Sequence, residues 1–382
     1  MKTAKTAIYL DYAAATPLLD QVFRAMEPYL RDNFYNPSSI YLKSIEVKQA
    51  IKEARQQVAK TLNARAKEII FTAGGSESNN LAIKGLMDKH KNKNLIVSAI
   101  EHDSVLKPAS RYDHKVCPVN KLGVVDLSKL KRLIDDQTVL ISIMYVNNEI
   151  GSIQPIKKIS ELIKDVKKDR IKRGNKTPLY FHSDACQAAN YLSLSVSKLG
   201  LDMMSLNGCK IYGPKQSGIL FINSNLTINP LIEGGGQEFS LRSGTENTSA
   251  IVGFAKSLQI VQKDRKEESQ RLTKLRDLLI DQMLNYSDRV KLNGSLKNRL
   301  SNNVNFLIDG IDNETLIMKL DNLGVMIASG SACNASNDAP SHVLKAIGLS
   351  DQQIKNSIRI TLGRFTNEKD LIAIVKYLKE NI

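Results

Sequence analysis

The chain has 382 residues, of which 42% are hydrophobic and 24% are charged. This length allows two domains around a substantial core, and no apolar run is long enough for a membrane span. The four cysteines form no CxxC pair and have neither zinc-ligand nor disulfide-scaffold spacing. We therefore expect a cytoplasmic globular protein with free thiols and without a signal peptide, metal site or membrane anchor.

The formal net charge is +15, from 54 basic and 39 acidic residues. A surplus of this size can attract nucleic acid or acidic proteins. The basic residues are spread along the chain and no RNA-binding motif accompanies them. This favours a solvated, lysine-rich surface over direct nucleic-acid binding.

After a short strand and turn at 8–17, amphipathic stretches alternate with apolar segments that end at turns. The predicted helices are 18–32, 43–63, 76–89, a short helix after 102, 126–135 and 156–173. The predicted strands are 69–72, 95–100, 116–119, 139–146, 179–184, 203–206 and 218–222. This alternation is typical of an α/β domain with a largely parallel sheet.

A long helix at about 250–286 is predicted to lead out of this domain, because the stretch is amphipathic and lacks proline. It is followed by predicted strands at 303–308, 325–328 and 357–362, a helix at 314–322 and a terminal helix. These elements predict a smaller α/β domain. We divide the chain into a large domain at 18–255 and a small domain at 1–17 and 256–382.

Five polar residues of different chemistry lie at or just past the carboxyl ends of predicted strands. They are Ser76, His102, Asn148, Asp184 and Lys210. In an open α/β sheet those strand ends line the ligand crevice. Each residue alone also fits a purely structural role. These roles are a serine that caps a turn, a histidine whose ring is hydrogen-bonded, a carboxylate in a salt bridge and a solvated lysine. Together they predict an assembled binding site.

The chemistry of these groups indicates a cofactor. Gly75 and Ser76 at a helix start offer backbone amides and a hydroxyl for a phosphate. Lys210 follows a strand and is a Schiff-base candidate, and Asp184 can keep a pyridine nitrogen protonated. His102 can stack on a flat ring. The set predicts a pyridoxal phosphate site, whereas no GxGxxG follows the first strands to support a dinucleotide.

Cys333 lies in a stretch of small and polar residues, 329–340. Such a loop is expected to be exposed, and a free thiol there is reactive unless it is an incidental surface cysteine. Cys117 and Cys186 lie in or beside predicted strands instead. Cys333 is therefore the candidate nucleophilic thiol.

These residues resemble the cysteine desulfurases of the NifS/IscS type, within the class V aminotransferases of fold type I. The resemblance implies a large domain with a mostly parallel seven-stranded sheet and a smaller α/β domain. The motifs that carry it lie at 9–14, 36–39, 72–80, 101–102, 146–151, 182–187, 210–215, 242–245, 329–333 and 357–359.

The resemblance implies a role for each matching residue. Lys210 would hold pyridoxal 5'-phosphate covalently and move protons, and His102 would stack on the ring as an acid/base. Asp184 would pair with the pyridine nitrogen and Gln187 with the ring hydroxyl. The remaining cofactor contacts would come from Gly75, Ser76, Asn148, Asn207, Cys209 and, across a homodimer interface, Thr245.

For the substrate, the resemblance implies that Arg359, Asn148 and Asn36 bind the carboxylate of L-cysteine. Cys333 would take the sulfur as a persulfide, release L-alanine and pass the sulfur to an acceptor protein in iron–sulfur cluster or tRNA thiolation pathways. The end of the chain at Ile382 also predicts no C-terminal extension for docking an iron–sulfur scaffold.

The chain departs from the family pattern at the phosphate. Relatives usually have serine where Asn207 stands and histidine where Cys209 stands, so weaker cofactor binding is expected. Histidine also usually follows the Asn-Pro-Ser-Ser turn, where this chain has 40–42, Ile-Tyr-Leu. Three alternatives stay open: a selenocysteine lyase of the same fold, a weakly cofactor-binding platform without catalysis, and an RNA-associated sulfur donor.

Overall fold

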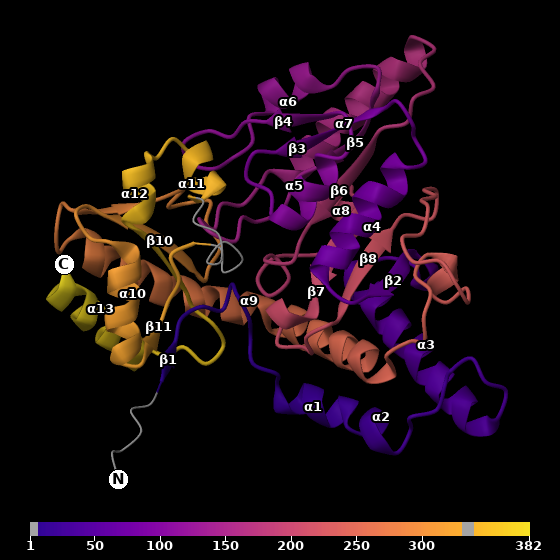
Figure 1. Ribbon diagram of the computed structural model, residues 1–382, viewed down its shortest axis with the longest axis horizontal. Helices are drawn as coiled ribbons and strands as arrows, with labels where there is room; N and C mark the ends of the chain where they lie inside the picture. Colours follow the sequence, from indigo (N-terminus) through magenta and orange to yellow (C-terminus); the bar gives the residue numbers. More distant parts are fainter. Residues whose placement is uncertain (1–6, 331–339) are drawn as a thin grey trace.

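The computed structural model describes residues 7–330 and 340–382, which form two lobes (Figure 1). The larger lobe contains a seven-stranded sheet with the order β2-β8-β7-β6-β5-β3-β4. Its strands are β2 (Ile69–Thr72), β3 (Asn94–Ser98), β4 (His114–Cys117), β5 (Thr138–Ser142), β6 (Tyr180–Asp184), β7 (Met203–Asn207) and β8 (Gly218–Ile222). Only β8 runs against the others. The predicted mostly parallel, seven-stranded sheet is confirmed.

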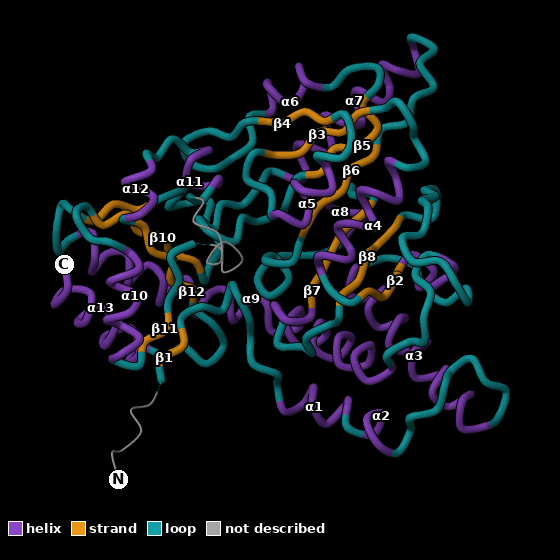
Figure 2. The backbone as a smooth tube through the Cα atoms, viewed as in Figure 1, coloured by secondary structure: helices purple, strands orange, loops and turns teal. Residues whose placement is uncertain are grey.

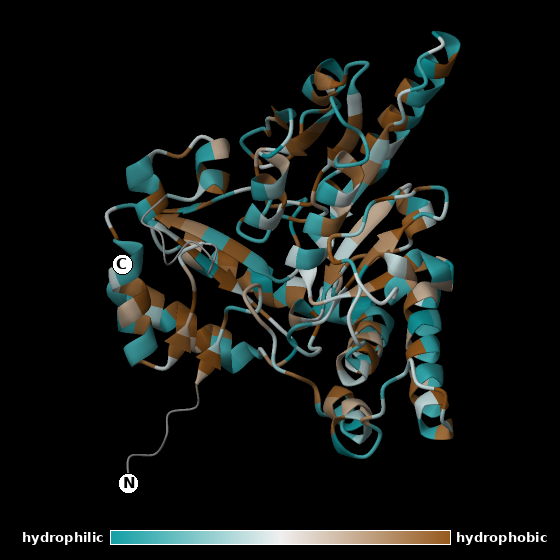
Figure 3. Ribbon diagram, turned by 45° about the vertical axis from the view of Figure 1, so that its right-hand side comes forward, coloured by the Kyte–Doolittle hydropathy of each residue, from teal (hydrophilic) through white to brown (hydrophobic). Residues whose placement is uncertain are grey.

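Helices cover both faces of this sheet, as parallel sheets require. The helices of this lobe are α1 (Asp20–Met26), α2 (Pro28–Arg31), α3 (Leu42–Leu62), α4 (Gly75–Met87), α5 (Asp103–Ala109), α6 (Leu127–Leu133), α7 (Ile156–Lys172), α8 (Val196–Leu199) and α9 (Thr248–Leu284). Of these, α1 and α2 contact α9. Helices α4 and α5 pack on one face, with Ile70 of β2. Helices α3, α7, α8 and α9 pack on the other, with Ile69 and Phe71. Figure 3 shows the hydrophobic strands between helices whose outer sides are hydrophilic.

The strand β4 lies two residues earlier than the predicted 116–119. It pairs with β3 in parallel from His114 to Cys117, and Pro118 follows. Proline has no backbone N–H to donate to the sheet ladder, so the strand ends before it. Val119 makes only an isolated bridge with Val125.

The smaller lobe is built around two short sheets (Figure 2). One is antiparallel with the order β12-β10-β9, and the other pairs β1 with β11 in parallel. Its elements are β1 (Ile8–Tyr9), β9 (Val290–Leu292), β10 (Asn303–Ile308), α10 (Asn313–Asn322), β11 (Val325–Met326), α11 (His342–Ala346), α12 (Asp351–Lys355), β12 (Ser357–Thr361) and α13 (Glu368–Asn381). The division of the chain at residues 17 and 255 stays a prediction.

The long helix predicted at 250–286 is confirmed as α9, which contacts α1 and α3 in the larger lobe and α13 in the smaller one. Asn247 caps its start by accepting from the amide of Ala250 at 3.1 Å. Across the described residues, none of the helices has the length and apolar character needed to cross a membrane.

Candidate active site

A cavity of about 200 Å³ lies at the carboxyl ends of the parallel strands, on the side where β6 ends at Asp184 and β7 at Asn207. All five residues predicted from the strand ends line it. The lining residues are Ala13, Ala14, Gly75, Ser76, Asn79, His102, Ser104, Met144, Val146, Asn148, Asp184, Cys186, Gln187, Asn207, Lys210 and Arg359. The structure thus brings most of the candidate site residues together.

Lys210 reaches the cavity from η2 (Gly208–Lys210), the short 3₁₀ turn that follows β7. Its Nζ donates a hydrogen bond to the carbonyl of Ala14, on the opposite wall. Asn190 Nδ2 donates to the Lys210 carbonyl at 2.7 Å, which fixes the backbone. Gly208 allows this tight turn, because a Cβ there would lie 2.8 Å from the carbonyl of Pro214.

Asp184 and His102 are joined by a short chain of hydrogen bonds. Asn79 Nδ2 donates to Asp184 Oδ2 at 2.7 Å and to Ser104 Oγ at 2.8 Å. The amide of Ser104 donates to His102 Nδ1 at 3.0 Å, capping α5. Since Nδ1 accepts this bond, the neutral imidazole carries its proton on Nε2. Cys186 also contributes, because its amide donates to Asp184 Oδ1 at 2.9 Å.

Arg359 brings a buried guanidinium from β12 of the smaller lobe. Its side chain is 2% exposed and pairs with Asp11 through Nη2 and Oδ1 at 2.7 Å. Its Nη1 donates to the carbonyl of Asn148 at 3.2 Å, and its Nε has no partner among the described residues. Arg359 also lines the cavity, so its guanidinium is a candidate partner for an anionic ligand there.

The amino terminus of α4 is open toward the cavity. Gly74 has φ +140°, which an L side chain rarely adopts, and a Cβ on Gly75 would lie 2.8 Å from Cys186 Sγ. The helix therefore begins with bare backbone amides beside Ser76. Asn207 lies against this end, with its Oδ1 accepting from the amide of Cys209 at 3.2 Å. Helix amides in this arrangement can hold a phosphate.

Three predicted site residues are absent from the cavity lining, and a fourth is not among the described residues. Cys209 is half-exposed on η2, next to Lys210, and Asn36 and Thr245 are exposed. Cys333 lies outside the described residues. Sequence reasoning in turn missed the lining residues Ala13, Ala14, Asn79, Ser104, Met144, Val146 and Cys186. The sequence could have indicated Asn79, because it lies one helical turn beyond Gly75.

The buried thiols are protonated. Burial raises the pKa of Cys186 well above its usual value, and the charge of Asp184 adds to this effect. Burial likewise raises the pKa of Cys117 to about 12. A thiol with so high a pKa is a poor nucleophile at neutral pH.

Glu101 is a fully buried carboxyl group directly before His102. Its Oε1 accepts from Ser98 Oγ at 2.5 Å and from the amide of Met144 at 2.8 Å. Burial raises its pKa to about 8, and the charge of Asp184 contributes in the same direction. The group is therefore neutral in the folded protein below that pH.

A Glu101→Gln variant should gain stability over the wild type as the pH rises. Between pH 4.5 and about 8 the unfolded chain releases this proton and the folded protein keeps it, so the wild type loses stability with rising pH. Glutamine keeps both acceptor contacts and has no proton to lose. Urea unfolding of both proteins at pH 5 and pH 8 should show a relative gain on the order of 3 kcal/mol. If the unfolding free energies of the two proteins changed equally with pH, the raised pKa of Glu101 would be contradicted.

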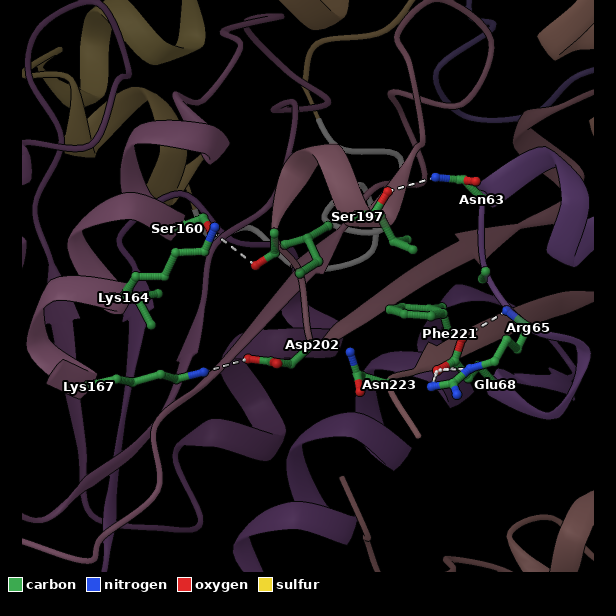
Figure 4. Close-up of a pocket in the computed structure, with 15 residues that line it drawn as sticks. Asn63, Arg65, Glu68, Ser160, Lys164, Lys167, Ser197, Asp202, Phe221 and Asn223 are labelled. Atoms are coloured by element: carbon green, nitrogen blue, oxygen red, sulfur yellow. Dashed lines mark hydrogen bonds and ion pairs between the residues drawn. The ribbon is translucent and has the colours of Figure 1, made fainter. Parts of the chain in front are cut away.

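A second hollow of about 500 Å³ lies at the amino ends of β6 and β7 (Figure 4). Four of its five charged side chains form ion pairs with one another, and Lys164 is the fifth. Arg65 Nη2 is 2.9 Å from Glu68 Oε1, and Lys167 Nζ is 3.4 Å from Asp202 Oδ2. No imidazole lines it. The cavity at the carboxyl ends of the strands is therefore the candidate active site.

Comparison with known proteins shows the family of the chain. A family model described as aminotransferase class-V matches residues 8–374. The chain belongs to the class V aminotransferase family. Cysteine desulfurase IscS of Dictyoglomus turgidum is 42% identical to it, over 96% of this chain and 92% of that protein. The IscS of Methanosarcina thermophila is 41% identical, over 100% of this chain and 93% of that protein.

Solved structures also resemble this class V aminotransferase. A NifS-like protein has a TM-score of 0.90 at 31% identity, covering 98% of this chain and 99% of that one. A structure described as SspA in complex with cysteine has a TM-score of 0.80 at 35% identity, covering 94% of this chain and 100% of that one.

Class V aminotransferases use pyridoxal phosphate, and the residues of the cavity fit it. The open end of α4 at Gly75 offers amides for the phosphate. A carboxylate, an imidazole and an amine are present at Asp184, His102 and Lys210. Arg359 adds a guanidinium to the cavity lining for a substrate carboxylate.

Replacing Cys209 by histidine should slow the loss of cofactor. Cysteine is a poor hydrogen-bond donor, whereas a histidine beside Asn207 could reach the phosphate. One hydrogen bond to a charged group changes the affinity for the ligand by about ten- to a hundredfold. The measurement is cofactor dissociation during dialysis, with pyridoxal, which lacks the phosphate, as the control ligand. Equal or faster loss from the variant would show that position 209 does not face the phosphate.

Proposed function

We propose that this class V aminotransferase is a cysteine desulfurase, which converts L-cysteine into L-alanine and keeps the sulfur on Cys333. One observation supports this most strongly. The cavity joins the amine of Lys210, the carboxylate of Asp184 and the imidazole of His102 in a chain 42% identical to a cysteine desulfurase.

In the proposed site, Lys210 would hold the cofactor covalently and Asp184 would pair with its pyridine nitrogen. Gln187 would contact the ring hydroxyl, and His102 would stack on the ring. The bound cofactor supplies an electron sink for the α-carbon of the substrate. Lys210 and His102, both in the cavity lining, would move the protons as an amine and an imidazole.

Arg359 and Asn148 would orient the substrate through its carboxylate. The guanidinium is already fixed by Asp11 and by the carbonyl of Asn148, so little side-chain entropy is lost on binding. A buried, fixed cation also selects amino acids that keep a free α-carboxylate. Asn36 lies outside the cavity of this chain, and its proposed contact would require a second copy.

Cys333 is the proposed sulfur acceptor. Its thiolate attacks the substrate sulfur, the carbon–sulfur bond breaks, and the β-carbon takes up a proton. L-Cysteine and the enzyme thiol thus become L-alanine and an enzyme persulfide, with no further oxidant or reductant. Cys117 and Cys186 cannot compete, because burial keeps both thiols protonated. An acceptor protein of iron–sulfur cluster or tRNA thiolation would then receive the sulfur in the cytoplasm.

The assay that tests this function is the release of alanine and sulfide from L-cysteine in the presence of a thiol reductant. A desulfurase should form the two products in equal amounts. L-Selenocysteine is the comparison substrate, since a selenocysteine lyase would act on it and leave L-cysteine unchanged. Absence of alanine from both substrates would favour a cofactor-binding platform without catalysis.

A homodimer is also proposed. The edge formed by α1, α2 and the start of α3 exposes large apolar side chains, which monomers rarely do over a contiguous area. They include Phe34, Ile40 and Leu42, which are 71%, 94% and 79% exposed. Thr245 is exposed as well and would reach the cofactor phosphate of the partner subunit.

Replacing Leu42 by glutamate should therefore weaken the dimer, because a charge at an apolar interface is costly to bury. Light scattering after size exclusion should give twice the chain mass for the wild type and a shift toward the monomer for the variant. Ile171→Glu is the control, since Ile171 is 77% exposed at the far end of α7. A monomeric wild type would refute the proposal.

A further inference from the structure

Asn79 is a fully buried polar side chain that joins three elements around the cavity. It lies in α4, one turn beyond Gly75, where the helix begins. Its Nδ2 donates to Asp184 Oδ2 at 2.7 Å, at the end of β6, and to Ser104 Oγ at 2.8 Å, in the first turn of α5. A carboxamide nitrogen has two hydrogens, and these two bonds use both. One amide group therefore connects α4, β6 and α5.

The second of these bonds leads to His102. Ser104 Oγ lies 2.8 Å from His102 Nδ1, and the amide of Ser104 donates to the same nitrogen at 3.0 Å. A backbone N–H can only donate, so Nδ1 carries no proton and is the acceptor in both contacts. The Ser104 hydroxyl therefore donates to Nδ1 while it accepts from Asn79. The imidazole is held by two donors, and Asn79 orients one of them.

The carboxylate of Asp184 is held in a similar way. Its Oδ1 accepts from the amide of Cys186 at 2.9 Å, and its Oδ2 accepts from Asn79. One donor on each oxygen fixes the plane of the carboxylate, which a single bond would leave freer to rotate. Asp184 and His102 are the proposed partners of the pyridine nitrogen and of the ring. Asn79 contacts the first directly and the second through one hydroxyl.

A buried asparagine beside an aspartate is not by itself a functional feature. Asn94 is 2% exposed at the amino end of β3, and its Nδ2 donates to the two carboxylate oxygens of Asp135 at 3.1 and 3.2 Å. Neither residue lines the cavity. Asn79 differs from Asn94 because its second bond goes to the hydroxyl that holds the imidazole, rather than to the same carboxylate. This difference makes Asn94 a matched control for position 79.

We propose that Asn79 is a positioning residue, which holds the carboxylate of Asp184 and the ring of His102 in one fixed relative orientation beside the bound cofactor. The inference rests on the roles proposed for those two residues, and it does not involve Cys333. Without Asn79, the Ser104 hydroxyl loses the bond that orients it, and the carboxylate keeps one donor instead of two. Both groups then spend part of their time outside the productive orientation, which slows proton transfer.

The test follows proton movement without the sulfur step. The bound cofactor makes the α-hydrogen of L-alanine exchangeable, so its replacement by solvent deuterium can be followed by mass spectrometry. Asn79→Ala removes a hydrogen bond to a charged group and should slow this exchange by about tenfold or more. It should also release cofactor about tenfold faster during dialysis, because the looser carboxylate holds the pyridine nitrogen less well. Asn94→Ala should leave both rates within about twofold, although its unfolding temperature falls.

Two further variants separate positioning from packing. Asn79→Asp keeps the size of the side chain but puts a carboxylate where a donor is needed, so it should slow exchange at least as much as Asn79→Ala. Ser104→Ala removes only the link to His102, so it should slow exchange by about fivefold and leave cofactor release unchanged. The double variant Asn79→Ala, Ser104→Ala should exchange within about twofold of Asn79→Ala, since both residues act through one chain of bonds.

Wild-type exchange in Asn79→Asp would show that size rather than hydrogen bonding matters at this position, and would overturn the inference. Slowing factors that multiply in the double variant would also overturn it, because the two residues would then act independently. If the Asn79 variants failed to fold, unchanged exchange in Ser104→Ala would still decide against it. Exchange of the α-hydrogen without formation of alanine from L-cysteine would instead contradict the proposed function alone.

Discussion

Lys210→Ala should lose the covalent link to the cofactor and nearly all desulfuration of L-cysteine. The amine lies at the cavity with its backbone fixed by Asn190, and no other lysine lines the cavity as described. Loss of proton transfer alone lowers such rates by on the order of 10²–10⁴-fold. Borohydride reduction followed by peptide mass spectrometry should place the cofactor on Lys210 in the wild type and on no peptide in the variant.

The matched control is Lys215→Ala, in the same turn and exposed to solvent. It should keep the covalent link, the absorbance of the bound cofactor and the activity. A borohydride-stable link that persists in Lys210→Ala would show that another amine holds the cofactor. Lower activity in both variants to the same extent would point to damage of the turn rather than to loss of a reacting group.

Much of this site was accessible from the sequence, because it is built on strand ends. The transition from an apolar segment to a polar residue is a local signal, and parallel strands bring such transitions to one edge. Asp184 and Lys210 were placed there for that reason, and the structure has both in the cavity wall. The predicted helix 126–135 shows the same locality, since Asp126 caps α6 by accepting from the amide of Ser128 at 2.9 Å.

What the sequence could not provide depends on contacts between distant segments. The place of Asn79 one helical turn beyond Gly75 is a local feature, but its hydrogen bonds to Asp184 and Ser104 require the angle at which α4 packs on the sheet. The short helices α11 and α12 were missed because packing against the apolar side chains of the larger lobe stabilises them more than their own periodicity does. Thr245 was expected to reach a partner subunit, and a single chain cannot test that contact.

Cys333→Ser should abolish sulfide release while leaving the cofactor and substrate steps intact. A serine hydroxyl is similar in size to a thiol, but it ionises far less readily and cannot form a persulfide. Absorbance changes on adding L-cysteine should therefore persist, whereas sulfide and persulfide should fall by on the order of a thousandfold or more.

Cys117→Ala is the control for this variant, because Cys117 is buried in β4 at the edge of the sheet and its thiol is protonated. It should release sulfide at the wild-type rate, although loss of a buried side chain lowers its unfolding temperature. If Cys333→Ser kept its sulfide release, the sulfur would have to leave by another route. Cys209 is then the remaining candidate, since it is half-exposed beside Lys210 while Cys117 and Cys186 are buried. A Cys209→Ser, Cys333→Ser double variant would decide between that thiol and direct release of sulfide from the substrate.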